Sequence, residues 1–425
     1  MVITPAPVFE AEARADIRMA ARRASVLDIV VPRLLAWGSG VLIFAMPIAS
    51  AARGFSDEIG RTLLAMTDAM LIALFVLSLR YSRNRWFSWL VVFLLVYASL
   101  FMVVGSDFPS FSISYQGLRK SMLWLFAIGV GLALPQRSIR PLSRAMIAVL
   151  FLVCLYAVKQ FFITSDFDRN LLDAQSASVY ANKIGQYTRA TSILSSGFHV
   201  GIAGCLLICF ALSTRKMSLI VRVLLIGVSL FAIYASFTRT FLILAGAAII
   251  LRFTARSASR MYVVITSALL VLTALLMLNF DVVDDVYSAL VNDDRFTGRG
   301  DSYDAFVSYL EQSPGGLLTG FGPGTAGSTL GDLYHPYGAP WIEPHNIFTK
   351  YIFEFGLPLA LALFLTVGAM VLRRPAYYEE KQFPREIARL AMFVLAFSGL
   401  SITSVETFPV SIYIGFLVGM LCRNG

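Results

Sequence analysis

The chain has 425 residues, of which 57% are hydrophobic and only 14% are charged, and its mean hydropathy is +0.73. A soluble enzyme would not stay in solution with this balance, and 4 Cys with 16 Pro exclude a disulfide-rich secreted scaffold and a disordered chain. The formal net charge is +9, but the basic residues lie between apolar runs, where they indicate membrane topology and not nucleic-acid binding. The composition therefore predicts an integral membrane protein.

The N-terminal segment, residues 1–33, precedes the first long apolar run and carries acidic and basic side chains. This pattern argues against a cleavable signal peptide, so we expect a cytoplasmic tail. A transmembrane helix needs about 20 apolar residues to cross about 30 Å of hydrocarbon, and twelve stretches approach this requirement. They predict an all-α polytopic membrane protein in which residues 34–425 form a single transmembrane domain. The expected spans are approximately 34–51, 62–79, 86–105, 121–135, 145–163, 199–214, two within 217–251, 261–280, 347–372, 390–405 and 407–422.

Two of these spans come from one apolar run, residues 217–251, which Arg239 interrupts. As a single helix this run would be about 50 Å long, which is too long for the bilayer. We therefore expect a tight hairpin that turns near Arg239.

The loops that alternate along the chain differ in their content of lysine and arginine. If the N-terminus is cytoplasmic, most basic residues outside the spans also lie in the cytoplasm, as the positive-inside rule requires, and so does the C-terminus. Two long segments, 164–198 and 281–346, then lie on the outer side. The second is expected to form a large loop between the ninth and tenth spans, with a short helix from Arg299 to Tyr309 and turns at 313–316 and 320–324.

The sequence does not predict a metal or cofactor site. Cys154, Cys205, Cys209 and Cys422 lie inside apolar segments, without CxxC spacing or a histidine partner, so we expect small buried core residues. The acidic residues between 281 and 294 lack the spacing of a calcium-binding loop. We therefore expect neither a metal nor a cofactor.

His345 is the first candidate for chemistry, because it lies in Glu343-Pro344-His345-Asn346 directly before the tenth span. A neutral imidazole at this outer surface can accept a proton from an attacking hydroxyl or orient that hydroxyl, since its unperturbed pKa is about 6.5. The alternative is an interfacial histidine that caps the following helix.

Arg239 and Arg189 are the candidates for binding an anion. Arg239 places a fixed positive charge at the tip of the expected hairpin, and Arg189 precedes the sixth span on the same outer face. A guanidinium group can bind two phosphate oxygens at once, which suits a diphosphate. We expect the two arginines to converge on one anion; the alternative for Arg239 is an interaction with lipid headgroups alone.

Other charged residues have competing interpretations. Arg299 lies in an Arg-Gly-Asp sequence, where a salt bridge within the loop is the simpler interpretation. A charged side chain inside a membrane is costly and faces a cavity or a partner. Asp68, Lys159 and Glu354 are charged residues inside the expected spans. We expect Lys159 and Lys350 to extend outward to the interface. Glu354 is expected to orient a polar group in a cavity or to pair with a nearby base.

From roughly residue 189 to residue 372, the chain resembles the O-antigen ligase/polymerase group of membrane glycan ligases and polymerases. Many members have a proline-asparagine pair after the arginine that precedes the sixth span, whereas this chain has Gly197-Phe198-His199 there. The features that carry the resemblance are Arg189, Phe237-Thr238-Arg239-Thr240, Gly298-Arg299 with Tyr303, Leu318 to Gly324, Pro344-His345-Asn346-Ile347-Phe348, and Tyr351 to Pro358.

The resemblance implies a GT-C-like architecture and a transferase that acts at the periplasmic face of the bacterial inner membrane. The donor would be a glycan carried by undecaprenyl diphosphate, which needs no nucleotide because it is already activated. Arg189 and Arg239 would hold the diphosphate, and His345 would orient or deprotonate the acceptor hydroxyl. Arg299, Asn346 and Glu354 are further candidates for substrate binding.

The acceptor is left open by the resemblance. Our first interpretation is a ligase that passes the glycan to lipid A-core, with Arg119 and Lys120 near the phosphates of this acceptor; their alternative is an interaction with ordinary membrane lipids. A polymerase would use the same donor as acceptor, and an oligosaccharyltransferase would use a protein hydroxyl. A secondary transporter with Asp68, Lys159 and Glu354 in its pathway is the alternative from a different class.

Overall fold

The computed structural model describes the larger part of the chain, in twelve segments. The predicted features that lie outside them, wholly or for the most part, include the span 261–280, the short helix from Arg299 to Tyr309, Arg299 itself and His345. The described residues are 26–104, 111–174, 183–184, 187–194, 196–214, 217–254, 306–308, 311, 314–326, 346–372, 386–399 and 408–422.

Helices dominate the described residues, as the all-α prediction requires. The exception within the described part is a small antiparallel hairpin of β1 (Lys183–Ile184) and β2 (Tyr187–Thr188). The four cysteines are buried and not bridged, as expected for core residues. The helices are α2 (Val26–Ala52), α3 (Asp57–Ser78), α4 (Arg85–Val104), α5 (Phe111–Ala133), α6 (Gln136–Phe162), α7 (Asp166–Ala174), α8 (Gly197–Ser213), α9 (Leu219–Ala235), α10 (Arg239–Thr254), α14 (Pro314–Thr319), α15 (Ile347–Phe355), α16 (Leu357–Leu372), α17 (Glu386–Gly399) and α18 (Val410–Leu421).

Several helices have the length and composition of membrane-spanning segments. Among the described residues, three are long and apolar enough to cross a membrane, namely Asp28–Ala52, Asp57–Ser78 and Gln136–Phe162, and shorter apolar helices accompany them. Exposed leucine, isoleucine, valine and tryptophan side chains cover the outside of the bundle. Such a surface is stable in a lipid bilayer and not in water, so the fold agrees with an integral membrane protein. The number of twelve spans stays a prediction.

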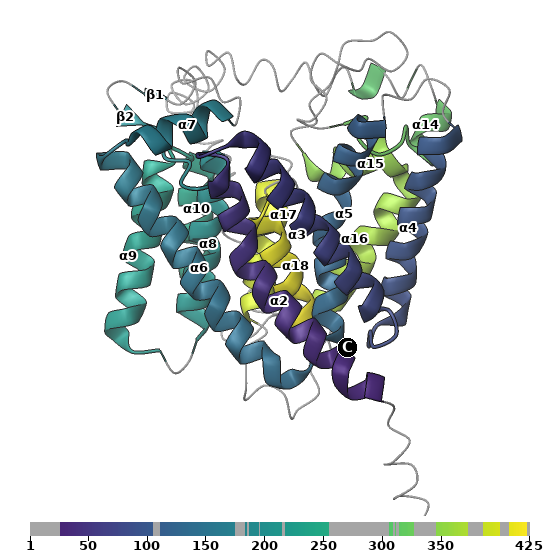
Figure 1. Ribbon diagram of the computed structural model, residues 1–425, viewed down its shortest axis with the longest axis horizontal. Helices are drawn as coiled ribbons and strands as arrows, with labels where there is room; N and C mark the ends of the chain where they lie inside the picture. Colours follow the sequence, from purple (N-terminus) through teal and green to yellow (C-terminus); the bar gives the residue numbers. More distant parts are fainter. Residues whose placement is uncertain are drawn as a thin grey trace, which may run out of the picture.

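The helices form an upright bundle with two distinct ends (Figure 1). We call one the cap end, because α7, the β1–β2 hairpin and α14 lie there and α15 begins there. The other is the base end, at which α2 begins. The connection from α2 to α3 is also at the cap end, where the Phe55 ring lies 4.7 Å from the Phe167 ring of α7. The elements outside the bundle that the structure describes are thus gathered at one end.

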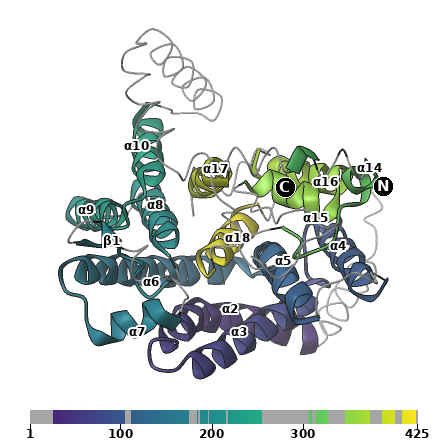
Figure 2. The same ribbon diagram turned by 90° about the horizontal axis from the view of Figure 1, so that it is seen from above.

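The last helix, α18, lies inside the bundle and packs against α5, α17, α6 and α8 (Figure 2). All its residues from Val410 to Leu421 are buried. Its contact with α5 depends on two glycines four residues apart: a Cβ atom on Gly415 would lie 2.4 Å from the Trp124 carbonyl oxygen, and one on Gly419 would lie 2.2 Å from the Ile128 carbonyl oxygen. Glycine at this spacing allows two helix backbones to approach closely.

Several boundaries differ from the sequence-based expectation. The helix α2 begins at Val26, inside the segment that we expected to be a cytoplasmic tail (1–33), and α5 begins at Phe111, ten residues before the expected span 121–135. Polar and charged residues in these helix ends weaken the hydropathy signal, but they pair with neighbouring elements inside the protein. The turn expected at 313–316 is wrong in part, because Pro314 begins the short helix α14; proline is well suited to the first position of a helix.

The expected span 347–372 is divided at Gly356 into α15 and α16. Gly356 has a φ angle of 80°, which a residue with a side chain rarely adopts. Its Cα also faces the 314–326 segment, because a Cβ atom there would lie 2.2 Å from the Leu318 carbonyl oxygen. The break therefore makes room for the 314–326 segment, which docks against the helix.

Candidate active site

The turn between α9 and α10 forms at Ser236–Thr238, so the predicted hairpin near Arg239 is confirmed. The turn is tight: Phe237 has a φ angle of 51°, and the hydroxyl oxygens of Ser236 and Thr238 are 2.5 Å apart. Arg239 is the first residue of α10. Its backbone N–H thus belongs to a helix N-terminus, where unpaired N–H groups and the helix dipole favour an anion.

Arg189 lies against this turn. Its Nε donates a hydrogen bond to the Ser236 carbonyl oxygen at 2.8 Å, and the backbone N–H of the next residue, Ala190, donates to the Ala235 carbonyl oxygen at 2.9 Å. The segment of Arg189 and the N-terminus of α10 are therefore joined directly. This supports the expectation that Arg189 and Arg239 serve one site.

The segment Gly197-Phe198-His199, where the chain departs from the family pattern, contributes to the placement of Arg189. The Arg189 guanidinium carbon lies 4.8 Å from the centre of the Phe198 ring, a cation–π contact. A Cβ atom on Gly197 would lie 2.6 Å from Arg189 Nε and 2.9 Å from the Ser236 carbonyl oxygen. This segment thus provides a stacking surface and a space for the arginine.

Gln160, on α6, fixes the backbone just after Arg189 and was not found from the sequence. Its side-chain oxygen accepts hydrogen bonds from the N–H groups of Thr191 and Ser192, both at 2.8 Å. Ser192 has a φ angle of 56°, and its hydroxyl donates to the Val153 carbonyl oxygen at 2.6 Å. Gln160 is fully buried. Its role depends on the bend at Thr191 and Ser192, which lies about 30 residues further along the chain. No local sequence motif predicts this bend.

The helix α7 is connected to the same region through Asp168. This buried carboxylate accepts hydrogen bonds from Lys159 Nζ at 2.5 Å and from the Tyr156 hydroxyl at 2.7 Å. Burial alone would raise the pKa of Asp168, but hydrogen bonds from Lys159, Ser165 and Tyr156 outweigh it and lower the pKa below its usual range. Lys159, which we expected to extend outward to the interface, is partly exposed and reaches the cap-end helix α7, where it forms an ion pair with Asp168.

Asn346 caps the N-terminus of α15. Its side-chain oxygen accepts hydrogen bonds from the Phe348 N–H at 2.7 Å and from the Thr349 N–H at 3.4 Å. The cap that we considered for His345 is thus formed by the residue that follows it in the sequence. His345 itself lies outside the described residues, as does Arg299, so their roles stay predictions.

Glu354 and Lys350 form a buried ion pair one turn apart on α15. Lys350 Nζ lies 2.7 Å from a Glu354 oxygen, and both side chains are completely buried. The expectation that Lys350 extends outward is therefore wrong. For Glu354, the interpretation as the partner of a nearby base is confirmed. A buried pair of this kind needs further hydrogen bonds to offset the loss of hydration.

These hydrogen bonds come from α5 and from the glycine-rich segment 320–324. Ser121 Oγ donates to Glu354 at 2.5 Å, and the Gly324 N–H donates to it at 3.0 Å. Lys350 also donates to the Ala326 carbonyl oxygen at 2.7 Å. Gly320, Gly322 and Gly324 all have positive φ angles, which confirms the expected turn. The sequence did not reveal that this turn is fixed to the buried charges of α15.

Arg119 lies inside α5 and not in a loop, because this helix begins earlier than expected. Its guanidinium pairs with Asp68 on α3 and lies 4.9 Å from the centre of the Phe408 ring. Asp68 Oδ1 and Arg119 Nη2 are buried and lack a hydrogen-bond partner among the described residues. The positive charge of Arg119 is therefore balanced inside the protein, while Lys120 next to it is half-buried.

The structure thus places the described candidates at the cap end in two groups. Arg189 and the start of α10 lie on the side of α8 and α9, whereas Asn346, Glu354 and the glycine-rich turn lie on the side of α14 and α15 (Figures 1 and 2). The residues that separate the groups in the sequence, 255–305, lie outside the described part. Apolar helices, paired interior charges and a basic turn at one end define a polytopic membrane protein with a candidate site at its cap end.

Residues 223–364 match the model of the O-antigen ligase family. This region includes the α9–α10 turn with Arg239, the glycine-rich turn and α15, but not Arg189. The match covers part of the chain and confirms the resemblance seen in the sequence; the members of that family are membrane enzymes that transfer glycans. No curated protein and no solved structure matches the chain.

Proposed function

We propose that the protein is an O-antigen ligase that transfers a glycan from undecaprenyl diphosphate to a hydroxyl of lipid A-core, at the periplasmic face of the inner membrane. The observation that carries this proposal is the contact of Arg189 with the turn that precedes Arg239. It supports a site in which two guanidinium groups and a helix N-terminus face one anion. A lipid diphosphate is the anion that fits a glycan transferase in a membrane.

The reaction is a displacement at the anomeric carbon of the donor. The oxygen of the acceptor hydroxyl forms a bond to this carbon, and the bond from the carbon to the diphosphate oxygen breaks. The departing undecaprenyl diphosphate takes the bonding electron pair, so negative charge develops on it. Arg189 and Arg239 stabilise this charge in the place of a metal ion, and no nucleotide is required because the donor is already activated.

His345 receives the proton of the acceptor hydroxyl or orients that hydroxyl. The helix cap formed by Asn346 supports this role, because the cap that we considered as the alternative for His345 is supplied by its neighbour. Asn346 also fixes the start of α15, and the pair Lys350–Glu354 fixes the helix to its surroundings. A base on a rigid support keeps a constant position relative to the reacting atoms. We assign Arg299 to the sugar or phosphate groups of a substrate.

The acceptor decides between a ligase and a polymerase, and one experiment distinguishes them. The purified protein in nanodiscs is given an undecaprenyl-diphosphate-linked glycan, with either lipid A-core or additional donor as acceptor and without nucleotide or added metal. We expect product on lipid A-core. Extension of the lipid-linked glycan alone would show a polymerase and contradict the ligase assignment, and a lack of product with both acceptors would contradict both.

A further inference from the structure

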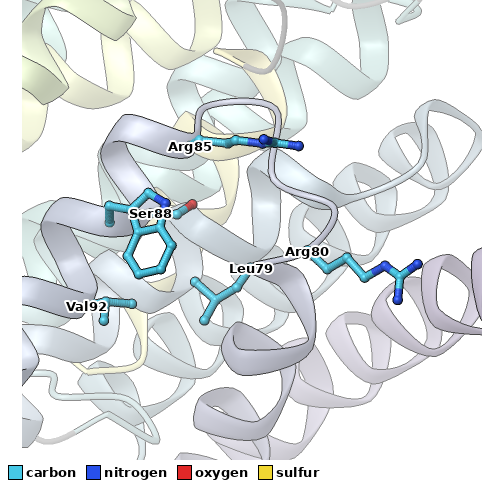
Figure 3. A pocket seen from close by; sticks show the side chains of 6 residues that line it. Leu79, Arg80, Arg85, Ser88 and Val92 are labelled. Atoms are coloured by element: carbon cyan, nitrogen blue, oxygen red, sulfur yellow. The ribbon is translucent and has the colours of Figure 1, made fainter.

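A cavity of about 250 Å³ lies at the base end of the bundle, between the end of α3 and the start of α4 (Figure 3). It is unrelated to the candidate site: α3 has 22 residues and is therefore about 33 Å long, and its other end is at the cap end. The residues that line the cavity are Leu79, Arg80, Arg85, Ser88, Trp89 and Val92.

The wall of the cavity is apolar. Leu79 and Val92 are half-buried, and Trp89 is 69% exposed. Ser88 contributes no free hydroxyl, because its Oγ lies 2.7 Å from the Ser82 hydroxyl and 3.2 Å from the Asn84 carbonyl oxygen. A ligand in this cavity therefore meets hydrocarbon surface, which suits an acyl chain and not a sugar.

The rim of the cavity is basic. Arg80 and Arg85 line it, and Arg83 lies between them in the connecting turn, which contains no acidic residue. Asp28 is the acidic group near Arg80, at 3.9 Å. Arg85 is exposed and has no ion-pair partner in the part of the chain that the structure describes. Among the described residues, the positive charge of the rim that lacks an ion-pair partner is thus that of Arg85, next to the partly exposed pair of Arg80 and Asp28.

An apolar wall below two arginines has the chemistry of a binding site for an anionic phospholipid. Arginine binds phosphate oxygens in pairs, and basic pockets between transmembrane helices attract anionic headgroups. Tryptophan is enriched at the same depth, where hydrocarbon meets the headgroups; Trp86 and Trp89 are both exposed here. The volume is sufficient for part of one lipid and too small for a polymeric glycan.

We propose that this cavity binds one anionic phospholipid of the bilayer, with its phosphate between Arg80 and Arg85 and an acyl chain against Leu79, Trp89 and Val92. The lipid would anchor the α3–α4 connection at the membrane surface. This proposal does not depend on the transferase assignment, since the cavity is a helix length away from the cap end.

Native mass spectrometry of the full-length protein, with equal amounts of phosphatidylglycerol and phosphatidylethanolamine, tests the proposal. We expect one phosphatidylglycerol to be retained in preference to phosphatidylethanolamine. The double substitution R80Q/R85Q should lower its retention about 30-fold, which corresponds to the loss of two headgroup contacts. The control is R137Q/R140Q, which removes two exposed arginines at the start of α6, also at the base end.

A second pair of variants tests the cavity without a change of charge. Val92→Trp fills the cavity and should also lower the retention of phosphatidylglycerol, whereas Val96→Trp, one turn further on α4 and 52% exposed, should leave it unchanged. Equal loss in R80Q/R85Q and R137Q/R140Q would show a general attraction to the basic end and overturn the proposal. Full retention of phosphatidylglycerol by Val92→Trp would also overturn the proposal. Equal retention of the two lipids by the unchanged protein would overturn it as well.

Discussion

At the scale of single residues, the candidate site depends on how Arg189 is held. Its guanidinium is stacked on Phe198 and bonded to the Ser236 carbonyl oxygen, and Gln160 fixes the backbone that follows it. A hydrogen bond to a charged group contributes about 1.5–3 kcal/mol. The arginine therefore has one preferred position, with its charge beside the start of α10.

The first prediction concerns Gly197, whose missing side chain leaves the space for Arg189. In Gly197→Ala, the new Cβ atom would lie 2.6 Å from Arg189 Nε, so the arginine must move away from the turn. We expect glycan transfer to fall at least about tenfold, equivalent to about 1.4 kcal/mol in the barrier, while the protein still folds.

The matched control is Gly227→Ala on α9, because nothing lies within 4 Å of a Cβ atom there. Transfer rates of the two variants, measured on samples with equal thermal stability, separate the site effect from a general effect of alanine. Equal rates in Gly197→Ala and the unchanged protein would show that the position of Arg189 does not matter.

Some contacts between residues could not be predicted from the sequence. The candidate Arg189 could be named from the sequence, but Gln160 could not, because its partners Thr191 and Ser192 follow it by about 30 positions and have no recognisable motif. The same applies to Asp68 and Arg119, which are 51 positions apart. Hydropathy identifies a costly charge in a membrane, but it does not identify the partner that balances the charge.

At the scale of elements, hydropathy predicted most helices because each must bury its backbone and expose apolar side chains to lipid. The α9–α10 hairpin was predictable for a stricter reason, since one helix of that length does not fit a bilayer. The break between α15 and α16 was missed in the hydropathy reading, because Gly356-Leu357-Pro358 lies in an apolar run. The proline, which suits the first turn of a helix and not its interior, and the docking of the 314–326 segment against Gly356 both favour the break.

The second prediction concerns the pair that fixes α15. Lys350→Met alone leaves the Glu354 carboxylate buried without its base, and Glu354→Gln alone leaves the Lys350 ammonium without its acid. Each single substitution should lower the free energy of unfolding by about 3–5 kcal/mol. The double substitution removes both charges and should cost clearly less than the sum of the two.

Thermal or denaturant unfolding of the four proteins in detergent measures this coupling. The Ser121 hydroxyl and the Gly324 N–H keep a partner in the glutamine of Glu354→Gln, so the hydrogen bonds of the glycine-rich turn are largely preserved. If the two single effects simply add, the ion pair does not couple Lys350 to Glu354 and this account of α15 is incorrect.

At the scale of the whole molecule, the paired interior charges favour a transferase over a transporter. Each charge that a transport pathway would require has a partner within the protein: Asp68 with Arg119, Lys159 with Asp168 and Glu354 with Lys350. A proton or ion pathway needs charges that change partners during transport. These three pairs instead connect helices and the outer segments into a fixed scaffold.

The candidate site and the basic cavity lie at opposite ends of the molecule. The O-antigen ligase region brings Arg239, the glycine-rich turn and the helix after His345 to the cap end, while the basic cavity is at the base end. The overall class, the resemblance to the O-antigen ligase family and the turn between α9 and α10 could be predicted from the sequence. The grouping of the site residues could not, because it depends on packing between helices that are distant in the chain.

The most direct test of the central claim is the rate of glycan transfer by Arg239→Ala and His345→Ala in nanodiscs. The control is Arg169→Ala, which removes an exposed arginine of α7 at the same end. We expect transfer to be lost, by at least about 100-fold, in the first two variants and to be unchanged in Arg169→Ala, with all three proteins inserted and folded. Full transfer by Arg239→Ala and His345→Ala would contradict the proposed site.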